Sequence, residues 1–511
     1  MGGIVLGIDL GTTNSCMARV DPLSGQARVL PNREGEATTP SVVHFDASGR
    51  VTVGSAARRQ AALHPTSTVF AAKRLLGRRF SDPVIQSLRR LLPYEVVADP
   101  AGNAAVRVHG QVKSPAEVMS HVLRYLKESA EARLGQGVDG AVITVPAYFD
   151  EVQRQETKQA GQRAGLTVHR LLNEPTAAML ACRFDESRPE NIAVFDLGGG
   201  TFDISLLHVE GEVVQVLATC GDNALGGDNV DELMVEALRR IFLKQTGVDL
   251  TGAPDALWRL RESAEATKRA LSERETTALD LPFLATREGN PLHLSLPSFS
   301  RTLLENLASR ELERLRAPCE QALADAGLAL EDIHRVVLVG GMTRMPAVRA
   351  RAERYLGRPG ERSVNPDEAV ALGAALEADI VAGTSPEAPQ VLLLDVLSRS
   401  LGIRTEGGRF SVLIPRNTTI PARETKVFTT TFHGQTHVDL EVYQGESPTV
   451  DANRYLGELR LTQLTAAEAG AVRVAVDFTI DADGILQITA REPATGREAQ
   501  ATLRPPTADS P

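Results

Sequence analysis

The chain has 511 residues, of which 42% are hydrophobic and 23% are charged. This composition is typical of a globular protein, and the length suggests about three domains. Acidic residues outnumber basic ones by ten, which argues against a nucleic-acid partner because such binding requires a basic surface. The four cysteines form no C-x-x-C pair, so neither a zinc site nor a disulfide framework is expected.

The start of the chain lacks the basic segment of a secretory signal, and Asp9 interrupts its apolar run early. No apolar run reaches the roughly 18 residues that a membrane-spanning helix needs. We therefore expect a cytoplasmic protein with no membrane partner.

Over residues 1–384, short apolar runs alternate with long helical patterns, as in α/β domains. The expected strands include residues 4–8, 141–145, 192–195 and 335–339. The expected helices include residues 116–134, 152–164, 228–242 and 255–271.

The character of the sequence changes near residue 384, where a segment rich in Gly and Pro precedes an apolar run. We interpret residues 385–396 as an interdomain linker. Beyond it the apolar residues alternate, and a turn at residues 481–484 separates two strand-like runs. This pattern predicts an all-β sandwich over residues 397–505 and a disordered tail over residues 506–511. No helical pattern follows the sandwich.

Two glycine-rich segments, residues 8–13 and 195–201, resemble each other, and each follows an apolar strand. Phosphate binding favours glycine, which lets backbone N–H groups approach, and hydroxyl groups, while a carboxylate can orient water around Mg²⁺. The segments supply these groups as Asp9, Gly11, Thr12 and Thr13, and as Asp196, Gly198, Gly199, Gly200 and Thr201. Either segment alone could be a tight strand-to-turn connection, but together they predict two related lobes around a phosphate.

A third segment, residues 336–346, runs from an apolar strand through paired glycines into a proline-started helix. A flat adenine ring could rest there, although a simple strand-to-helix connection is the alternative. The chain has no P-loop sequence. The G-x-G-x-x-G match at residues 135–140 precedes a strand, so it lacks the context of a dinucleotide site and is interpreted as a helix-to-strand loop.

Eight motifs in order resemble the seventy-kilodalton heat-shock chaperone family of the DnaK type, over about residues 1–505. They are Asp9-Leu-Gly-Thr-Thr-Asn-Ser15, Val145-Pro-Ala-Tyr-Phe149, Asn173-Glu-Pro-Thr-Ala-Ala178, Asp196-Leu-Gly-Gly-Gly-Thr-Phe-Asp203, Gly340-Gly-Met-Thr-Arg-Met-Pro346, Leu392-Leu-Leu-Asp395, Asn417-Thr-Thr-Ile-Pro421 and Asp481-Ala-Asp-Gly-Ile485. The resemblance implies an α/β actin-like two-lobed ATPase domain, a linker and a β-sandwich that binds extended polypeptide.

The resemblance also implies a site for ATP or ADP with Mg²⁺ and K⁺. Its implied catalytic residues are Lys73, Glu174, Asp9, Asp196 and Thr201, with Asp9 and Asp196 meeting the metal mostly through water. Its implied nucleotide contacts are Gly11, Thr12, Thr13, Gly198, Gly199, Gly200, Gly226, Gly227, Glu265, Lys268, Arg269, Ser272, Gly341, Met342, Arg344 and Asp367. The basic neighbours of Lys73, which are Arg74, Arg78 and Arg79, are expected to be solvated charges.

Communication between the domains is implied for Pro146, Arg154, Arg170, Asn173, Leu392, Leu393, Leu394 and Asp395. Within this set, Arg170, Asn173 and Asp395 would help to dock a J-domain co-chaperone, and a nucleotide exchange factor is a further implied partner. Asp395 could equally be an ordinary linker charge.

The implied peptide pocket consists of Leu401, Ile403, Phe428 and Val438, although all four could be sandwich core. Glu406 and Thr431 depart from the family, which has an apolar pair arching over the peptide at these positions, and the helical lid is expected to be missing. Glu406 should therefore favour peptides with basic flanks. Two alternatives remain open, an actin-fold small-molecule kinase and an actin-like filament protein.

Overall fold

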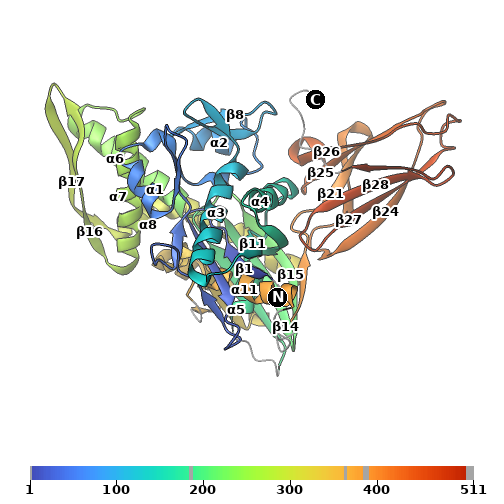
Figure 1. The fold of residues 1–511 in the computed structure, drawn as a ribbon, viewed down its shortest axis with the longest axis horizontal. Helices are drawn as coiled ribbons and strands as arrows, with labels where there is room; N and C mark the ends of the chain where they lie inside the picture. Colours follow the sequence, from blue (N-terminus) through green and yellow to red (C-terminus); the bar gives the residue numbers. More distant parts are fainter. Residues whose placement is uncertain (1–2, 183–187, 362–364, 384–390, 502–511) are drawn as a thin grey trace.

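The structure is a computed structural model that describes residues 3–182, 188–361, 365–383 and 391–501. The chain forms two α/β lobes that face each other and a β-sandwich beside the first lobe (Figure 1). The first lobe contains residues 3–182 and the second lobe residues 188–361, and helix α11 returns to pack on the first sheet.

The first lobe is built on a sheet with strand order β12-β11-β1-β2-β3, and β4 also pairs with β2. Its strands are β1 (Ile4–Asp9), β2 (Asn14–Val20), β3 (Ala27–Val29), β4 (Thr38–Pro40), β11 (Val138–Val145) and β12 (Thr167–Asn173). Strand β1 is parallel to β11 and antiparallel to β2. Helices contact β1 and β11, which explains why these strands are almost continuously apolar.

The second lobe repeats this arrangement with the order β19-β18-β13-β14-β15, extended by β20 and β23. Strand β13 is parallel to β18 and antiparallel to β14. The strands are β13 (Glu190–Leu197), β14 (Phe202–Glu210), β15 (Val213–Asp222), β18 (Arg335–Val339), β19 (Gly360–Glu361), β20 (Leu392–Val396) and β23 (Thr419–Ile420). The internal repeat expected from the two glycine-rich segments is confirmed, because each segment follows the equivalent strand of its sheet.

Nine longer helices accompany these sheets in the described part of the chain. They are α3 (Pro115–Leu134), α4 (Glu151–Arg163), α5 (Glu174–Ala181), α6 (Gly227–Thr246), α7 (Pro254–Glu273), α8 (Arg301–Glu313), α9 (Arg316–Ala326), α10 (Pro346–Leu356) and α11 (Ala369–Ala382). Local sequence sets where they begin: Ser114 caps α3, and Asp150 forms a capping box with Gln153 at the start of α4. Helices α5 and α11 pack on each other between the two central sheets.

Smaller elements extend both lobes. They are β5 (Val43–Phe45), β6 (Val51–Val53), β7 (Thr68–Val69), β8 (Glu95–Ala98), β9 (Ala104–Val108), β10 (Gln111–Lys113), α1 (Ser55–Ala61), α2 (Pro83–Leu88) and the hairpin β16 (Thr276–Arg287) and β17 (Asn290–Ser300). The hairpin lies beside α6 and α7, at the edge of the molecule farthest from the sandwich (Figure 1).

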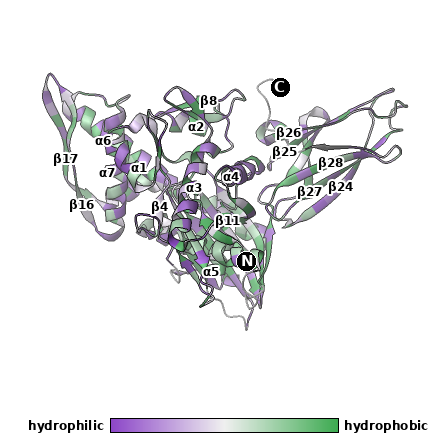
Figure 2. Cartoon of the chain, viewed as in Figure 1, coloured by the Kyte–Doolittle hydropathy of each residue, from purple (hydrophilic) through white to green (hydrophobic). Residues whose placement is uncertain are grey.

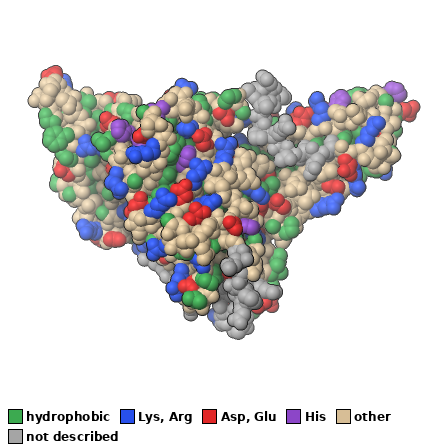
Figure 3. Space-filling view, in the orientation of Figure 1, with side chains coloured by type: hydrophobic (Ala, Val, Ile, Leu, Met, Phe, Trp, Pro, Cys, Tyr) green, Lys and Arg blue, Asp and Glu red, His purple; other side chains and the backbone are tan. Residues whose placement is uncertain are grey.

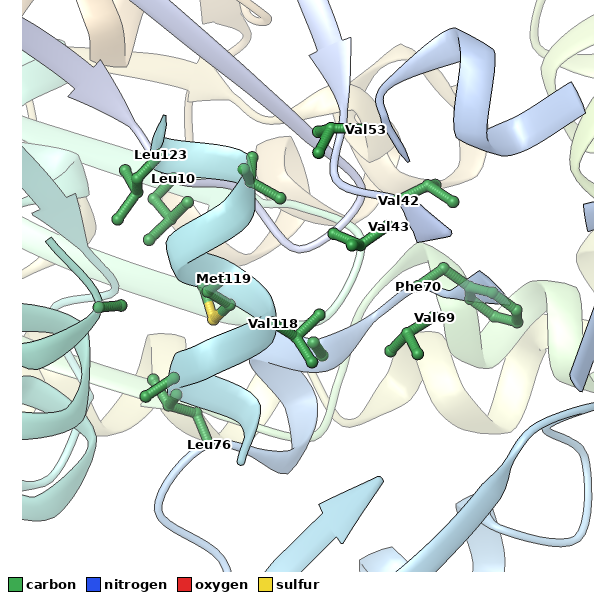
Figure 4. Close-up of a cluster of buried hydrophobic side chains, with 14 of the residues drawn as sticks. Leu10, Val42, Val43, Val53, Val69, Phe70, Leu76, Val118, Met119 and Leu123 are labelled. Carbon is green, nitrogen blue, oxygen red and sulfur yellow. The ribbon is translucent and has the colours of Figure 1, made fainter. Parts of the chain in front are cut away.

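The core of the first lobe fixes the positions of the segments around the cleft. Val118, Met119 and Leu123 on α3 lie in one cluster with Leu10 and Val69, all almost fully buried (Figure 4). Burying apolar area contributes roughly 25 cal/mol per Å². This packing therefore anchors both the turn after β1 and the segment that follows β7.

The apolar run after residue 390 forms strand β20, which pairs in parallel with β15 and antiparallel with β23. The predicted boundary at residues 384–390 lies outside the described residues. So does the predicted tail at residues 506–511.

The sandwich consists of two four-stranded sheets, β22-β21-β25-β26 and β24-β27-β28-β29. The strands are β21 (Leu401–Thr405), β22 (Arg409–Ile414), β24 (Ala422–Thr429), β25 (Val438–Gln444), β26 (Arg454–Leu461), β27 (Arg473–Ile480), β28 (Leu486–Glu492) and β29 (Arg497–Ala501). Val438, Leu440 and Val442 are buried, as the alternation in the sequence predicts. The predicted hairpin is also present as β27 and β28.

Hydrophobic residues concentrate in the central strands, whereas α4 at the surface is largely hydrophilic (Figure 2). On the face seen in Figure 3, basic and acidic side chains are interspersed. Among the described residues, no helix combines the length and apolar character needed to span a bilayer.

Candidate functional site

The two glycine-rich turns face each other across the lobes. A methyl group at Gly199 would overlap the Thr13 hydroxyl, and one at Gly200 would press on Thr12. The turn of the second lobe is held by the start of α6, where the amides of Gly227 and Asp228 donate to the carbonyls of Gly198 and Gly199 at 3.0 and 2.8 Å. Only glycine allows this close approach, so the two turns form a narrow backbone-lined cradle.

Four carboxyl groups and one lysine gather below this cradle. Lys73 Nζ lies 2.7 Å from Glu174 Oε1, and both side chains are at most 10% exposed. The Thr144 hydroxyl donates to Asp9 Oδ1 at 3.4 Å. Burial and the neighbouring Glu174 raise the pKa of Asp9 to about 7, and the same causes raise the pKa of Asp196 well above its usual value.

Asp203 completes the acidic centre. Burial, followed by the charge of Glu174, raises the pKa of Asp203 to about 7, although its carboxylate accepts the Tyr148 amide at 2.8 Å. One lysine therefore faces four acidic groups, so the donor set is suited to a divalent cation. Within the described residues, no three acidic, His or Cys side chains are arranged to ligate a metal directly. Since Mg²⁺ keeps several of its water ligands in proteins, these carboxylates would meet it mostly through water.

Lys73 lies in a short 3-10 helix, Ala72–Leu75, with its ammonium group 5.3 Å from the centre of the Phe149 ring. The expectation that its neighbour Arg74 is a solvated charge is wrong. Arg74 is 6% exposed, forms an ion pair with Glu232 on α6 and approaches Asp228 at 3.9 Å. Arg74 thus links the lysine segment to the second lobe, a contact that spans 158 positions in the sequence.

Arg78 is also only partly exposed. It pairs with Asp82 at 2.8 Å and donates to the carbonyl of Asn223 in the second lobe at 3.1 Å. Arg79 bonds to the carbonyl of Ala101. None of these three arginines is therefore simply solvated.

The predicted nucleoside contacts on α7 separate into two groups. Lys268 Nζ bonds to Asp231 at 2.7 Å and to the Gly227 carbonyl at 3.0 Å. Ser272 bonds back to the Lys268 carbonyl at 3.1 Å, and Arg269 remains largely exposed. Glu265 instead pairs with a residue of the first lobe.

The remaining nucleoside contacts follow β18. Met342 is buried, and its side chain would collide with a methyl group at Gly227. Arg344 pairs with Asp367 at 2.6 Å. Gly341 also lies beside Asp367. The structure thus brings Met342 and Lys268 to the same glycine, Gly227, whose amide also holds the second glycine-rich turn.

Sequence reasoning selected Glu265 but missed the residues around it that close the cleft. Arg58 on α1 pairs with Glu262 and Glu265 on α7, at 3.2 and 2.7 Å. Behind them, Arg261 lies 4.6 Å from the Phe70 ring, and Trp258 packs 5.2 Å from the same ring. These side chains line a pocket together with Thr12 and Thr13. The i, i+3, i+7 spacing of Trp258, Arg261 and Glu265 on one helix face was the available signal.

Helix α5 connects the acidic centre to the linker strand. It begins at Glu174, and two residues farther Thr176 donates to Asp395 Oδ2 at 3.1 Å. Asp395 is 6% exposed, so it is not an ordinary solvated charge. The linker residues Leu392, Leu393 and Leu394 are aligned with β15.

Arg154 lies on the other side of the same connection. Its guanidinium donates to Asn173 Oδ1 at 2.7 Å and to the carbonyl of Asp483 in the sandwich at 3.2 Å. The Pro146 carbonyl accepts the Phe149 amide at 3.1 Å, in the turn that leads to α4.

The sandwich contacts both lobes through residues that sequence reasoning did not select. Asp483 pairs with Lys158 on α4 at 2.6 Å and accepts the Leu171 amide at 2.9 Å. On the second lobe, Asp325 of α9 pairs with Arg416 at 2.7 Å and accepts Asn417 Nδ2 at 3.1 Å. Arg170 pairs with Glu377 on α11 and faces no sandwich residue in any of these contacts.

The four predicted pocket residues lie in or against the sandwich core. Leu401, Ile403 and Val438 belong to the core cluster, and the partly buried Phe428 packs against it. Glu406 and Thr431 are exposed. Glu406 lies in the turn between β21 and β22, and the Thr431 amide is fixed by Gln435 Oε1 at 2.7 Å.

A comparison with protein-family models matches residues 5–510 to the family described as Hsp70 protein. The chain belongs to the Hsp70 family. This membership agrees with two facing α/β lobes joined to a β-sandwich, which are the actin-like ATPase lobes and the sandwich of an Hsp70. As an Hsp70 the chain is a nucleotide-binding ATPase that uses Mg²⁺, and a chaperone that binds unfolded polypeptides and co-chaperones. The match includes the sandwich, which neither a small-molecule kinase nor a filament protein on the actin fold would explain.

Proposed function

We propose that this chain is an ATP-dependent chaperone in which ATP hydrolysis controls the affinity of the sandwich for extended polypeptide. The observation that carries the proposal is that a single helix, α5, contacts both the acidic centre and the linker strand. Glu174, which bonds Lys73, begins the helix, and Thr176, two residues later, holds Asp395 of the linker strand. A shift of Glu174 on hydrolysis would therefore move Thr176 and change its hydrogen bond to Asp395 of the linker strand.

In the proposed reaction, water attacks the γ-phosphate in line, and catalysis rests on positioning and electrostatics. The backbone cradle binds the phosphates, with Thr12, Thr13 and Thr201 adding hydroxyl donors. Lys73 places positive charge at the γ-phosphate, and Glu174 orients the attacking water. The metal ions implied for the site, Mg²⁺ and K⁺, would supply positive charge that offsets the charge of the phosphates.

Asp9 and Asp196 would hold that metal through water. On the nucleoside side, Glu265 and Lys268 would bind the ribose, and Arg269, Ser272, Met342 and Arg344 would enclose the adenine. The placement of Lys268 and Met342 at one glycine supports this assignment.

The proposed division of the chain follows from these roles. Residues 1–384 form the ATPase domain, residues 385–396 the linker, residues 397–505 the peptide-binding sandwich and residues 506–511 a tail. In the arrangement described above, which we call the docked arrangement, β20 is paired with β15 and the sandwich contacts both lobes. Release of β20 would separate the two domains, a coupling of typically 1–3 kcal/mol.

Peptide binding would use the apolar side chains of Leu401, Ile403, Phe428 and Val438, which requires the sandwich core to open at β21 and β25. An extended peptide would add main-chain hydrogen bonds to strand edges, a known recognition mode. Glu406, in an exposed turn, would favour peptides with basic flanks.

Two kinds of co-chaperone are proposed as partners. Arg170, Asn173 and Asp395 would form part of the site for a J-domain protein, and a nucleotide exchange factor would complete the cycle. Asn173 and Asp395 are buried in the docked arrangement, so the J-domain protein would reach Arg170 before the other two.

The test is steady-state ATP hydrolysis by the intact chain, alone and with an unfolded peptide, a J-domain protein or both. We expect slow basal hydrolysis that each addition accelerates and that the two together accelerate further. Hydrolysis that responds to neither addition would refute the proposed coupling. Phosphate transfer to a small-molecule acceptor would instead indicate a kinase.

A further inference from the structure

Glu151 is the first residue of α4, and the docked sandwich covers its carboxyl group. Its neighbour Val152 packs against the sandwich core, and Ile485 of the sandwich packs in return against the core of the first lobe. Glu151 is 3% exposed between these two contacts. Its burial is therefore shared between the first lobe and the sandwich.

The hydrogen bonds of Glu151 show how much of its surroundings the sandwich provides. Its backbone amide donates to Gln444 Oε1 of β25 at 3.2 Å. Its carboxylate accepts Gln155 Nε2 from its own helix at 2.7 Å, and the Leu486 amide from the sandwich. The backbone amide of Gln153, in the first turn of the helix, donates to Asp150 Oδ1 at 2.9 Å and not to Glu151. Both partners of the carboxylate are neutral hydrogen-bond donors, so they stabilise its ionised form only in part.

The cations near Glu151 are bonded elsewhere. The guanidinium of Arg154 donates to three backbone carbonyls and to Asn173. Lys158 pairs with Asp483 at 2.6 Å. On the sandwich side, Arg454 lies 3.9 Å from Asp150. None of these three cations has an ion pair with Glu151 within the described residues.

The acidic neighbours oppose ionisation further. Asp150 precedes Glu151 on the helix, and Asp481 and Asp483 lie in the sandwich turn that covers it. Burial, with only partial compensation from Gln155, the Leu486 amide and the charge of Arg154, raises the pKa of Glu151 to about 8. Without the sandwich, the carboxyl group would face water and titrate near its ordinary value of 4.5.

We infer that docking of the sandwich on the first lobe takes up a proton at Glu151, so that acidification stabilises the docked arrangement. The sign follows from linkage. Because the docked arrangement holds the proton more tightly, the docking constant is highest at low pH and falls as pH rises towards 8. A single linked proton gives at most about a tenfold change per pH unit within that window. The inference rests on the proposed function, since it requires that the domains dock and separate.

The experiment measures docking by energy transfer between dyes on the intact chain. Cysteines introduced at the exposed positions Ser87 of the first lobe and Thr462 of the sandwich carry the dyes, and the four native cysteines are buried. Docking is followed from pH 5.5 to 8.5, with and without ATP and Mg²⁺. We expect the docking constant to fall at least about tenfold between pH 6 and 8. Glu151→Gln, which imitates the protonated group, should stay docked across this range with a change below about twofold.

The matched control is Glu131→Gln, on the neighbouring helix α3. Glu131 accepts the Val138 amide of the first lobe itself at 3.1 Å, so this variant should keep the pH dependence of the wild type. Equal pH dependence in the wild type and Glu151→Gln would overturn the inference, as would its loss only in Glu131→Gln. Energy transfer that ATP does not change at any pH would instead refute the proposed coupling of nucleotide to docking.

Discussion

The acidic centre surrounds one lysine with four carboxyl groups. Lys73 is the cation that bonds Glu174, and it is surrounded by Asp9, Asp196 and Asp203, whose pKa values are all raised. Electrostatic interactions are stronger in such a buried site than in water. Groups here therefore act mainly by fixed charge, and removing a single charge should have a large effect on the reaction.

For Lys73→Ala, we expect ATP binding to remain but hydrolysis to be about 100 to 1,000 times slower. Loss of one preorganised charge typically costs about 3–4 kcal/mol of transition-state stabilisation. Single-turnover hydrolysis measures the effect, and Lys244→Ala, at an exposed position on α6, is the matched control. Hydrolysis of the Lys73→Ala variant at the wild-type rate would remove this lysine from the mechanism.

The raised pKa of Asp9 predicts that the affinity for ATP changes with pH in opposite directions in the presence and in the absence of Mg²⁺. Below pH 7 the carboxyl group is mostly protonated, so it cannot hold the water shell of Mg²⁺, and the affinity for Mg²⁺–ATP should fall as pH drops from 8 to 6. When a chelator removes the metal, the ionised carboxylates repel the phosphates. Protonation removes this repulsion, so the affinity for metal-free ATP should rise as pH drops from 8 to 6. Calorimetric titrations measure both, and identical trends would contradict this role for Asp9.

At the level of elements, strand β20 and helix α5 act as one unit. The linker strand adds to the edge of the sheet that carries the second glycine-rich turn, and α5 contacts both central sheets. Asp395 joins the two elements, because its carboxylate accepts the Thr176 hydroxyl at 3.1 Å and the Val396 amide at 2.9 Å. The linker is therefore fixed at its end by a buried, hydrogen-bonded carboxylate.

Asp395→Ala should abolish peptide stimulation of hydrolysis while basal hydrolysis changes by less than about twofold. The variant leaves the Thr176 hydroxyl without its partner, which costs about 1–3 kcal/mol when a polar group is buried. Asp280→Ala is the matched control, because Asp280 is an exposed acidic residue on the hairpin strand β16, which has no contact with the linker strand in the described part of the chain. Full stimulation of the Asp395→Ala variant would show that the linker communicates through other contacts.

Periodicity was sufficient to predict the strands and helices that build the site, because β1, β13 and α7 carry strong local patterns. The meeting of the two glycine-rich turns also followed from sequence, since each turn ends an equivalent strand. Arg74 was interpreted wrongly because its partners lie on α6, far along the chain, and no local pattern reports such a contact. For the same reason the pairing of Asp325 with Arg416 could not be predicted, since it depends on how separate parts of the chain pack.

In the whole molecule, charged contacts hold the sandwich to both lobes. Asp483 bonds to Lys158 in the first lobe, and Arg416 bonds to Asp325 in the second. A change in the angle between the lobes would move these two anchor points relative to each other. A large change in this angle would strain or break one of the two contacts, so under the proposed function docking and nucleotide state would be linked through geometry as well as through the linker.

The contact with the second lobe can be tested by charge reversal. Asp325→Arg should weaken docking and reduce peptide stimulation, because it places two arginines together at an interface where the Asp325 side chain is only 11% exposed. The double variant Asp325→Arg with Arg416→Asp should restore most of the docking and most of the peptide stimulation. The double-mutant cycle should give a coupling energy of about 1–3 kcal/mol. Interdomain energy transfer and stimulated hydrolysis are the two measurements. Additive losses in the double variant would mean that this pair contributes nothing specific, and that the first lobe alone positions the sandwich.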